Sequence, residues 1–345
     1  MGRLFFMNTK DKIILRDKVD KAVRSFFEAH CYLEAQTPRF VPSPDIQPTL
    51  SHFESTLVTA TGESYKGAMI TSPEYALKKI VSAEIPRIYE LARVFRNNEP
   101  LDKMHNPEFT MLEWYRIGSS LDEGIQETIR LVGAVAEAIN GGQTIERNGK
   151  IISLKPEDWT VVSVEELFRR HCGMDQLSHV TKEDYQKALK SLDMDWQEDD
   201  TISDLFQRLM LNCVDPVLRD SPAPVIVKHY PRHEATLARI NEQGFAERFE
   251  AYIAGIELCN GYAELTDPVE QRRRFVEEQR ERQRLGKTLF PIDEALIEAL
   301  KQIDQPLFGN GLGLDRLIMI LAGFSSIESV ILFPGVQLFP PKEAI

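Results

Sequence analysis

Two segments of this chain alternate apolar and polar side chains on either side of a short break, which is the pattern of a β-hairpin. In the first, residues 93–116, the β-prone pair Val94 and Phe95 is followed by a polar loop and then by Phe109 and Met111, which have polar neighbours. Strands joined by a hairpin are antiparallel. The fold therefore has to include an antiparallel sheet.

Arginines lie on the first arm of this hairpin, at Arg93 and Arg96. An arginine can hold a phosphate in a two-point contact and stabilise the charge that develops during nucleotidyl transfer. Phe109 on the return arm could stack on a base. A surface hairpin with ordinary ion pairs is the alternative interpretation of the same residues.

The second segment, residues 248–267, carries a series of carboxylates. A two-residue turn at 254–255 would place Tyr252 opposite Glu257 and make Glu250 its diagonal neighbour on the same face. Converging carboxylates repel each other, and Mg²⁺ removes that repulsion while keeping water and phosphate oxygens as its other ligands. Glu264 lies beyond a polar turn, where it could receive an ammonium group. A solvent-facing hairpin edge that carries charges against aggregation is the alternative.

The rest of the chain is mainly helical in pattern. Apolar residues at helical spacing predict an amphipathic helix over residues 11–30, which runs into a Pro-rich extended segment, and a second helix from an N-cap at Asp122 to Ala138. Short amphipathic helices over about 161–220 indicate a helical insertion. The charged helix at 268–286 is most simply a solvated face.

A glycine-rich segment, GNGLGLDRL at residues 309–317, is predicted to be a turn that leads into an apolar helix. Its glycines would allow the backbone to approach a ligand closely, and Arg316 would follow on the first helical turn. The segment has neither GxGxxG nor a Walker lysine, so it predicts no Rossmann or P-loop site. A packing corner is the alternative.

Composition excludes several classes of protein. The formal net charge of −12 disfavours an extended surface for nucleic acid or anionic membrane. No apolar run reaches the roughly 18 residues of a spanning helix, and the first residues do not form a signal peptide. The four cysteines are scattered, which suggests neither a disulfide framework nor a zinc site. We therefore expect a cytoplasmic protein that contacts no membrane.

Taken in order, the Pro-ended helix, the arginine hairpin closing in HNPEFTMLEWY, the segment IELCNGYAELTD and the GLGLDR turn resemble motifs 1, 2 and 3 of class II aminoacyl-tRNA synthetases. Within that class they resemble the lysine branch, over nearly the whole chain. The resemblance implies an α+β fold: one catalytic domain over residues 1–345, with a mainly antiparallel sheet flanked by helices and the helical insertion.

The motif 1 helix begins close to the first residue, so we expect no N-terminal OB-fold that binds an anticodon. The chain is in this respect similar to the truncated paralogues of the PoxA or GenX type, which attach (R)-β-lysine to a lysine side chain of elongation factor P. The resemblance implies ATP and Mg²⁺ as cofactors, (R)-β-lysine or lysine as substrate, elongation factor P rather than tRNA as partner, and a homodimer formed through the motif 1 helix and the Pro-rich strand.

The resemblance also implies roles by position. Arg96 and Arg316 would be catalytic, and Glu250 and Glu257 would hold Mg²⁺. The nucleotide would be bound by Arg96, Asn97, Asn98, Glu99, Asn106, Phe109, Glu257, Leu258, Gly313 and Arg316. The lysine-like substrate would be enclosed by Ser72, Pro73, Glu74, Tyr115, Asn260, Glu264 and Gly311.

Some alternatives stay open at this level. The loop after Arg96 is one residue longer than the RNE loop of this branch, so Asn98 or Glu99 could contact adenine, and we favour Glu99. Gly311 stands where the β-lysine ligases usually have Ala and lysyl-tRNA synthetases have Gly, which leaves β-lysine or α-lysine open. An enzyme that acylates tRNA or another small acceptor, and an inactive regulatory paralogue, are the competing functions. For residues 72–74, a Ser-Pro turn with a capping Glu is the alternative to a substrate site.

Overall fold

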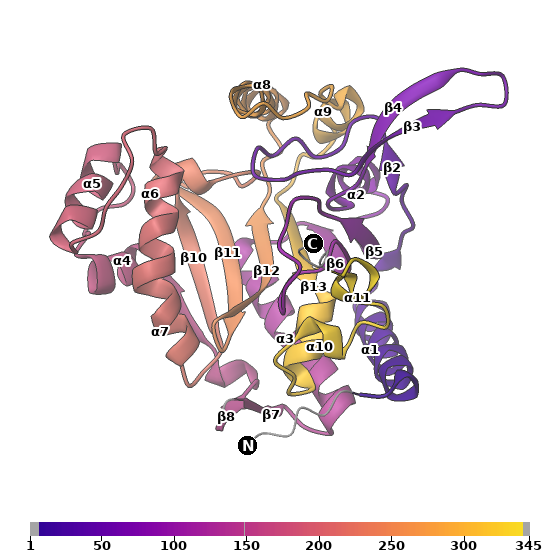
Figure 1. The fold of residues 1–345 in the computed structure, drawn as a ribbon, viewed down its shortest axis with the longest axis horizontal. Coiled ribbons are helices and arrows are strands. Elements are labelled where there is room, and N and C mark those ends of the chain that lie inside the picture. The colour runs from indigo at the N-terminus through magenta and orange to yellow at the C-terminus, as the bar shows by residue number, and fades with distance from the viewer. Residues whose placement is uncertain (1–6, 148, 341–345) are drawn as a thin grey trace, which may run out of the picture.

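The computed structural model describes residues 7–147 and 149–340. An eight-stranded sheet in the order β1-β5-β6-β13-β12-β11-β10-β9 forms its centre (Figure 1). Its strands are β1 (Leu33–Glu34), β5 (Arg87–Phe95), β6 (Glu108–Ile117), β9 (Thr160–Ser163), β10 (Val225–Pro231), β11 (Phe245–Ile253), β12 (Ile256–Ala263) and β13 (Leu307–Gly313). Neighbouring strands are antiparallel except at the two edges, where β1 pairs in parallel with β5 and β9 with β10. The predicted fold class is confirmed.

Helices α1 (Thr9–Ala29), α3 (Leu121–Asn140) and α10 (Leu314–Leu321) cover one face of this sheet. The strand alternation directs Leu112 and Trp114 of β6 into the core beneath them, while Glu113 and Tyr115 point to the opposite face. The N-cap of α3 is Ser120, which forms a capping box with Glu123, so the predicted N-cap at Asp122 was wrong by two residues.

The glycine-rich segment is a central strand, β13, and the prediction of a turn was wrong. Gly309 pairs with Tyr115 of β6 and with Tyr262 of β12. A Cβ atom at Gly309 would lie 2.4 Å from the Tyr115 ring and 2.1 Å from Glu264 Oε1. Glycine is therefore needed here because large side chains of the neighbouring strands occupy the space above the backbone.

The predicted insertion consists of α4 (Val164–Cys172), α5 (Lys182–Ser191), α6 (Ile202–Leu209), the π-helical turn η2 (Met210–Val214) and α7 (Asp215–Asp220). These helices lie between β9 and β10 in sequence and form the lobe at the left of Figure 1. Phe168, Tyr185 and Phe206 pack there in a hydrophobic cluster that extends to β10 and β11.

Helices α2 (Glu74–Ile80), α8 (Pro268–Arg284) and α9 (Glu294–Leu300) pack on the face of the sheet that carries Tyr115. A small sheet of β2 (Phe40–Val41), β3 (Glu54–Val58) and β4 (Ser64–Met69) lies beside them, and the β3–β4 hairpin projects from the molecule (Figure 1). The remaining elements are β7 (Thr144–Arg147), β8 (Lys150–Ser153), α11 (Gly335–Leu338) and the 3-10 turns at Pro156–Asp158, Arg232–Glu234 and Ile327–Ser329.

Helix α8 is not a purely solvated face. Arg282 is 2% exposed, and its guanidinium donates to the backbone carbonyls of Thr288, Gln47 and Leu50. The prediction was wrong for this residue because its charge is satisfied by carbonyl oxygens, which a sequence pattern does not display. Within residues 7–147 and 149–340, no helix combines the length and apolarity needed to cross a membrane.

Candidate active site

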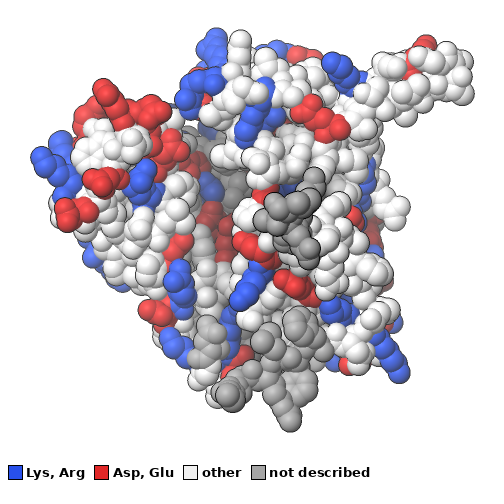
Figure 2. Space-filling model, in the orientation of Figure 1, with Lys and Arg blue, Asp and Glu red and all other residues white. Residues whose placement is uncertain are grey.

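A cavity of about 920 Å³ opens on the face of the sheet opposite α1, α3 and α10. Figure 2 shows the surface hollowed between the lobe of α4–α7 and the rest of the molecule, with acidic and basic side chains in the hollow. Side chains of β6, β11, β12 and β13 form its floor, and residues of α6, η2 and α7 contribute to its wall.

The hairpin of β11 and β12 presents the carboxylates of the second sequence segment. Tyr252 pairs with Glu257 across the turn, as predicted, but Ala251 pairs with Cys259, so Leu258 has no register partner. This β-bulge at Leu258 shifts the alternation by one residue. As a result Glu257 and Asn260 both point into the cavity, which an unbulged strand would not allow.

One part of the cavity collects buried acidic groups. Lys78 Nζ of α2 lies 2.5 Å from Glu74 Oε1 and 2.6 Å from Glu264 Oε2. Glu113 accepts hydrogen bonds from Ser72 Oγ and from Tyr115 Oη, each at 2.6 Å. Glu264 Oε1 is buried and has no hydrogen-bond partner in the described part of the chain.

Three carboxylates and one ammonium leave this cluster short of positive charge. Burial and the Glu74 carboxylate raise the pKa of Glu113 to about 8. Burial also raises the pKa of Glu264, although Lys78 opposes this effect. The cluster is thus built to accept a further cation, because an ammonium group would lower both pKa values and satisfy Glu264 Oε1.

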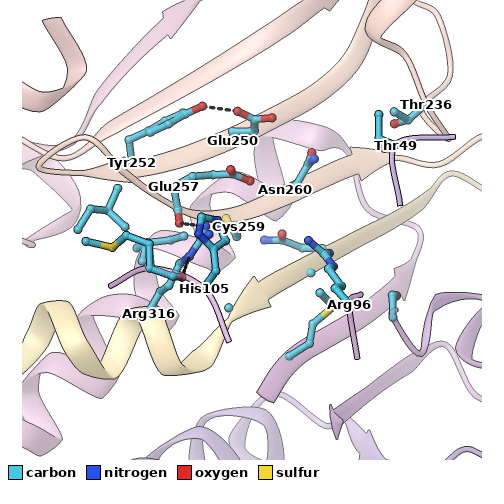
Figure 3. A pocket seen from close by; sticks show the side chains of 18 of the residues that line it. Thr49, Arg96, His105, Thr236, Glu250, Tyr252, Glu257, Cys259, Asn260 and Arg316 are labelled. Carbon is cyan, nitrogen blue, oxygen red and sulfur yellow. Dashed lines mark hydrogen bonds between the residues drawn. The ribbon is translucent and has the colours of Figure 1, made fainter. Parts of the chain in front are cut away.

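Basic and aromatic residues line another part of the cavity. The Arg96 guanidinium lies 5.3 Å from the centroid of the Phe109 ring, and Arg96 Nε is buried without a hydrogen-bond partner in the described residues. Arg316 Nη1 donates to the backbone carbonyl of Glu257 at 3.2 Å (Figure 3). Cationic side chains beside an aromatic face suit a nucleotide, whose phosphates and base each find a partner.

Glu250 and Glu257 point toward the same space from adjacent strands (Figure 3). Glu250 accepts hydrogen bonds from Arg248 Nη2, at 2.5 Å, and from Tyr252 Oη. Burial and the charge of Glu250 raise the pKa of Glu257 to about 7. Within the described residues no group of three or more His, Cys, Asp or Glu side chains could hold a metal. Mg²⁺ commonly takes only one or two carboxylates while phosphate and water complete its shell, and Glu250 and Glu257 would suit that coordination.

Comparison with known proteins decides the family. The family model of class II tRNA synthetases (D, K and N) matches residues 3–337. The chain belongs to this family. The resemblance to class II synthetases that the sequence motifs indicate is thereby confirmed.

Several relatives of this class II synthetase carry curated names. The elongation factor P (R)-β-lysine ligase of Pasteurella multocida is 34% identical over 330 residues, which cover 95% of each chain. The ligase of the same name from Pectobacterium atrosepticum is 36% identical over 93% of this chain and 94% of its own. The lysine–tRNA ligase of Bacillus subtilis is 30% identical over 96% of this chain and 65% of its own.

Most residues that the class II motifs imply do line one cavity. They are Ser72, Glu74, Arg96, Glu99, Asn106, Phe109, Tyr115, Glu250, Glu257, Leu258, Asn260, Glu264, Gly311, Gly313 and Arg316. Pro73, Asn97 and Asn98 are not among the lining residues. Asn97 Nδ2 instead donates to the backbone carbonyl of His52, and of the two alternatives for adenine only Glu99 lines the cavity.

Sequence reasoning missed Glu113, Lys78 and Arg248. Glu113 lies two residues before Tyr115 on β6, so strand alternation would have placed both side chains on one face. Lys78 follows Glu74 by one helical turn, which is also a readable signal. For Arg248, which is 8% exposed, the pattern offered no sign of burial.

A hydrogen-bond network connects the three motif segments beside the basic part of the cavity. Arg16 of α1 donates to Asp315 Oδ1 at 2.8 Å and to Thr110 Oγ1 at 2.9 Å. Asp315 Oδ2 accepts from the Thr110 backbone N–H at 2.6 Å. Helix α1, strand β6 and helix α10 therefore share one hydrogen-bond network next to Arg316.

Proposed function

We propose that this chain activates (R)-β-lysine, or lysine, with ATP as an aminoacyl-adenylate and transfers the acyl group to a lysine side chain of elongation factor P. The observation that carries the proposal is the charge layout of the cavity. Glu74 and Glu264 share a single lysine, and together with Glu113 they suit a substrate with an extra ammonium group, while Arg96 and Arg316 suit a triphosphate. The names of the curated ligases support this substrate and this acceptor.

In the first step the substrate carboxylate attacks the α-phosphate of ATP in line, and pyrophosphate leaves. The carboxylate is already ionised at neutral pH, so no general base is needed. Arg96 stabilises the charge that develops on the α-phosphate, Phe109 supports the adenine, and Arg316 covers the adenine or the γ-phosphate. Positioning and charge stabilisation carry the rate.

Glu250 and Glu257 are the residues that would hold Mg²⁺. Arg248 and Tyr252 fix the orientation of Glu250, and no hydrogen bond involves the Glu257 carboxyl group within the described residues. The ion, when bound, supplies positive charge to the phosphate oxygens. The fit rests on the raised pKa of Glu257, because a divalent cation removes the repulsion between the two carboxylates.

The competing function is transfer of the same acyl group to tRNA or to another small acceptor, and the lysine–tRNA ligase relative favours it. Purified elongation factor P and tRNA, offered side by side to the enzyme with radiolabelled amino acid, distinguish the two. Label on elongation factor P supports the proposal, and label on tRNA alone contradicts it.

The first step is tested by ATP–pyrophosphate exchange. We expect Arg96→Ala and Glu257→Ala each to lower exchange by about 10²- to 10³-fold, because each removes a charge contact to the triphosphate or its metal. Arg93→Ala is the matched control, since Arg93 lies on β5 three residues before Arg96 but is exposed, with Nε 3.9 Å from Glu108 Oε1. Near-normal exchange in either of the first two variants contradicts the assignment.

We also propose that the enzyme acts in the cytoplasm as a homodimer through α1 and β1. Ile13 and Ile14 of α1 and Leu33 of β1 are each more than half exposed, which is costly for apolar side chains on a free surface. Ile14→Glu combined with Leu33→Glu should halve the mass measured by sedimentation, and a monomeric wild-type protein contradicts this part.

A further inference from the structure

Glu234 is a carboxylate of the cavity that neither the amino acid side nor the nucleotide side uses. It ends the 3-10 turn after β10, is 8% exposed and lines the cavity. Its Oε2 accepts from Gln207 Nε2 of α6 at 3.3 Å. Its Oε1 is buried and has no hydrogen-bond partner among residues 7–147 and 149–340. A buried carboxylate oxygen without a donor is costly unless a ligand supplies one.

The surroundings of Glu234 do not neutralise it fully. Arg248 Nη1 donates to the Glu234 backbone carbonyl at 2.8 Å but remains 3.9 Å from Oε2. His233 Nε2 lies 4.0 Å from Oε1, and burial lowers the pKa of this histidine to about 4, so it is uncharged at neutral pH. Burial raises the pKa of Glu234, while Arg248 and hydrogen bonds from Ser203 and Gln207 oppose that effect.

A single side chain connects Glu234 to the reaction centre. Arg248, which contacts the Glu234 carbonyl, also donates through Nε to Asn260 Oδ1 at 3.0 Å and through Nη2 to Glu250 Oε1 at 2.5 Å. Glu250 and Asn260 are register partners on β11 and β12 (Figure 3). Glu234 therefore lies beside the substrate-bordering strands, on the side of the cavity where Gln207 and Leu211 of the insertion form the wall.

Transfer of the acyl group to an acceptor amine needs a carboxylate that can bind the amine as an ammonium ion and remove a proton from it. An alkylamine has a pKa near 10.4, so it arrives as an ammonium ion, which is not a nucleophile. A buried carboxylate with a raised pKa can both bind this ion and take a proton from it. The carboxylates around Lys78 are the alternative bases, but in the proposed function they hold the ammonium group of the amino acid.

We infer that Glu234 receives the acceptor ammonium group and removes one of its protons before the amine attacks the acyl-adenylate. The inference rests on the proposed function for the presence of an adenylate. The proton moves to Glu234 Oε1, the amine nitrogen bonds to the acyl carbon, and the bond from that carbon to the AMP oxygen breaks. The second nitrogen proton leaves with the AMP phosphate, so the product is an amide and no redox partner is needed.

The experiment compares two nucleophiles on the full chain. The enzyme forms the adenylate from ATP and lysine or β-lysine and is offered n-butylamine, which is charged at neutral pH, or hydroxylamine, which is not. Mass spectrometry gives the ratio of butylamide to hydroxamate. We expect Glu234→Gln to lower this ratio at least tenfold, because only the charged amine needs the carboxylate. Glu242→Gln is the matched control at an exposed position.

A ratio within twofold of wild type in Glu234→Gln overturns the inference, as does an equal loss of both products. If Glu234→Gln does not fold, Glu234→Ala with added formate replaces it. Restored butylamide formation then supports the inference, and no restoration overturns it.

Elongation factor P is used as a third acceptor. If the wild type makes hydroxamate and butylamide but does not modify elongation factor P, the proposed acceptor is wrong, and the ratio still decides the role of Glu234. If no adenylate product forms at all, the proposed function and the inference are both overturned, and absence of pyrophosphate exchange identifies this case.

Discussion

Lys78 Nζ lies 2.6 Å from Glu264 Oε2, and neither side chain is more than 3% exposed. This ion pair occupies the place where the proposed substrate brings its own ammonium group. The protein's lysine and the substrate therefore neutralise the same carboxylates, and their effects on stability should depend on each other.

Lys78→Met is expected to destabilise the ligand-free protein by about 3 to 5 kcal/mol, because it leaves buried carboxylates without their cation. Added lysine should raise the melting temperature of this variant more than that of the wild type, since the ligand then supplies the only ammonium group. Differential scanning fluorimetry measures both effects. Lys79→Met, at the next residue, removes a more exposed contact to Asp293 and should leave the lysine response as in the wild type. Equal shifts in all three proteins would refute the shared-carboxylate account.

Glu113→Gln should flatten the pH dependence of stability. Burial and Glu74 raise the pKa of Glu113 to about 8, and an unfolded Glu titrates near 4.3. Between these values the folded state binds more protons than the unfolded state, so the free energy of unfolding falls as pH rises. Other buried carboxylates act in the same direction, and the difference between wild type and variant isolates Glu113.

Urea unfolding of the ligand-free protein at several values between pH 5 and pH 8 measures this difference. The matched control is Glu108→Gln on the same strand, where the side chain is half exposed. A Glu113→Gln slope equal to that of the wild type would show that Glu113 does not carry the raised pKa.

Substitution by alanine should destabilise the protein at one glycine of β13 and leave its stability unchanged at another. A Cβ at Gly311 would lie 3.5 Å from Met111 Sδ and 3.6 Å from Glu113 Oε2, which is ordinary contact, so Gly311→Ala should fold normally. At Gly309 the Cβ would lie 2.1 Å from Glu264 Oε1, so Gly309→Ala should cost about 1 to 3 kcal/mol and impair amino acid binding.

Gly311→Ala adds a methyl group to the cavity beside Glu113, so it should change the preference between lysine and β-lysine by roughly 10- to 200-fold. Pyrophosphate exchange with each amino acid measures the preference, and urea unfolding measures the cost at Gly309. A destabilised Gly311→Ala, or an unaffected Gly309→Ala, would contradict the packing described for β13.

Arg282→Met should loosen the loop at residues 47–50, whose carbonyls Arg282 holds from α8. The variant removes the guanidinium donors, while the Leu50 N–H still donates to the Gln47 carbonyl and Lys287 Nζ still lies 3.4 Å from the Leu50 carbonyl, so the cost should be about 1 kcal/mol. Hydrogen–deuterium exchange should rise in peptides that cover this loop, and KM should increase because Gln47 and Leu50 line the cavity. Arg284→Met removes only an exposed pair with Glu281 and should change neither measurement.

Local sequence patterns predicted the hairpins and the long helices, because these elements follow the regular spacing of apolar residues in strands and helices. The pairing of Tyr252 with Glu257 follows from a two-residue turn, and the hairpin of β5 and β6 follows from apolar alternation. Alternate glycines in β13 misled the prediction, because a strand whose neighbours supply the large side chains has the same composition as a loop. The burial of Arg282 depends on carbonyl groups far away in sequence, which no local pattern reports.

Most residues that the family motifs imply line one cavity, and strand geometry explains which lining residues the motifs left out. Glu113 stood inside a recognised motif, but its partners Ser72 and Gly311 come from other strands and loops. Asn97 belongs to the motif as well, yet its amide is directed to the His52 carbonyl. Sequence resemblance gives positions, whereas the direction of each side chain depends on register.

The bulge at Leu258 decides where β12 tolerates a change of length. Deleting Leu258 would return the strand to regular pleating and leave Glu257 and Asn260 on the cavity face, because they already lie opposite Tyr252 and Glu250. Deleting a residue between Asn260 and Glu264 would instead turn Glu264 toward the core that holds Cys259 and Ala263. In a homologue, an alignment gap at Leu258 is therefore compatible with the same cavity, whereas a gap after Asn260 would mark a protein whose cavity lacks this carboxylate.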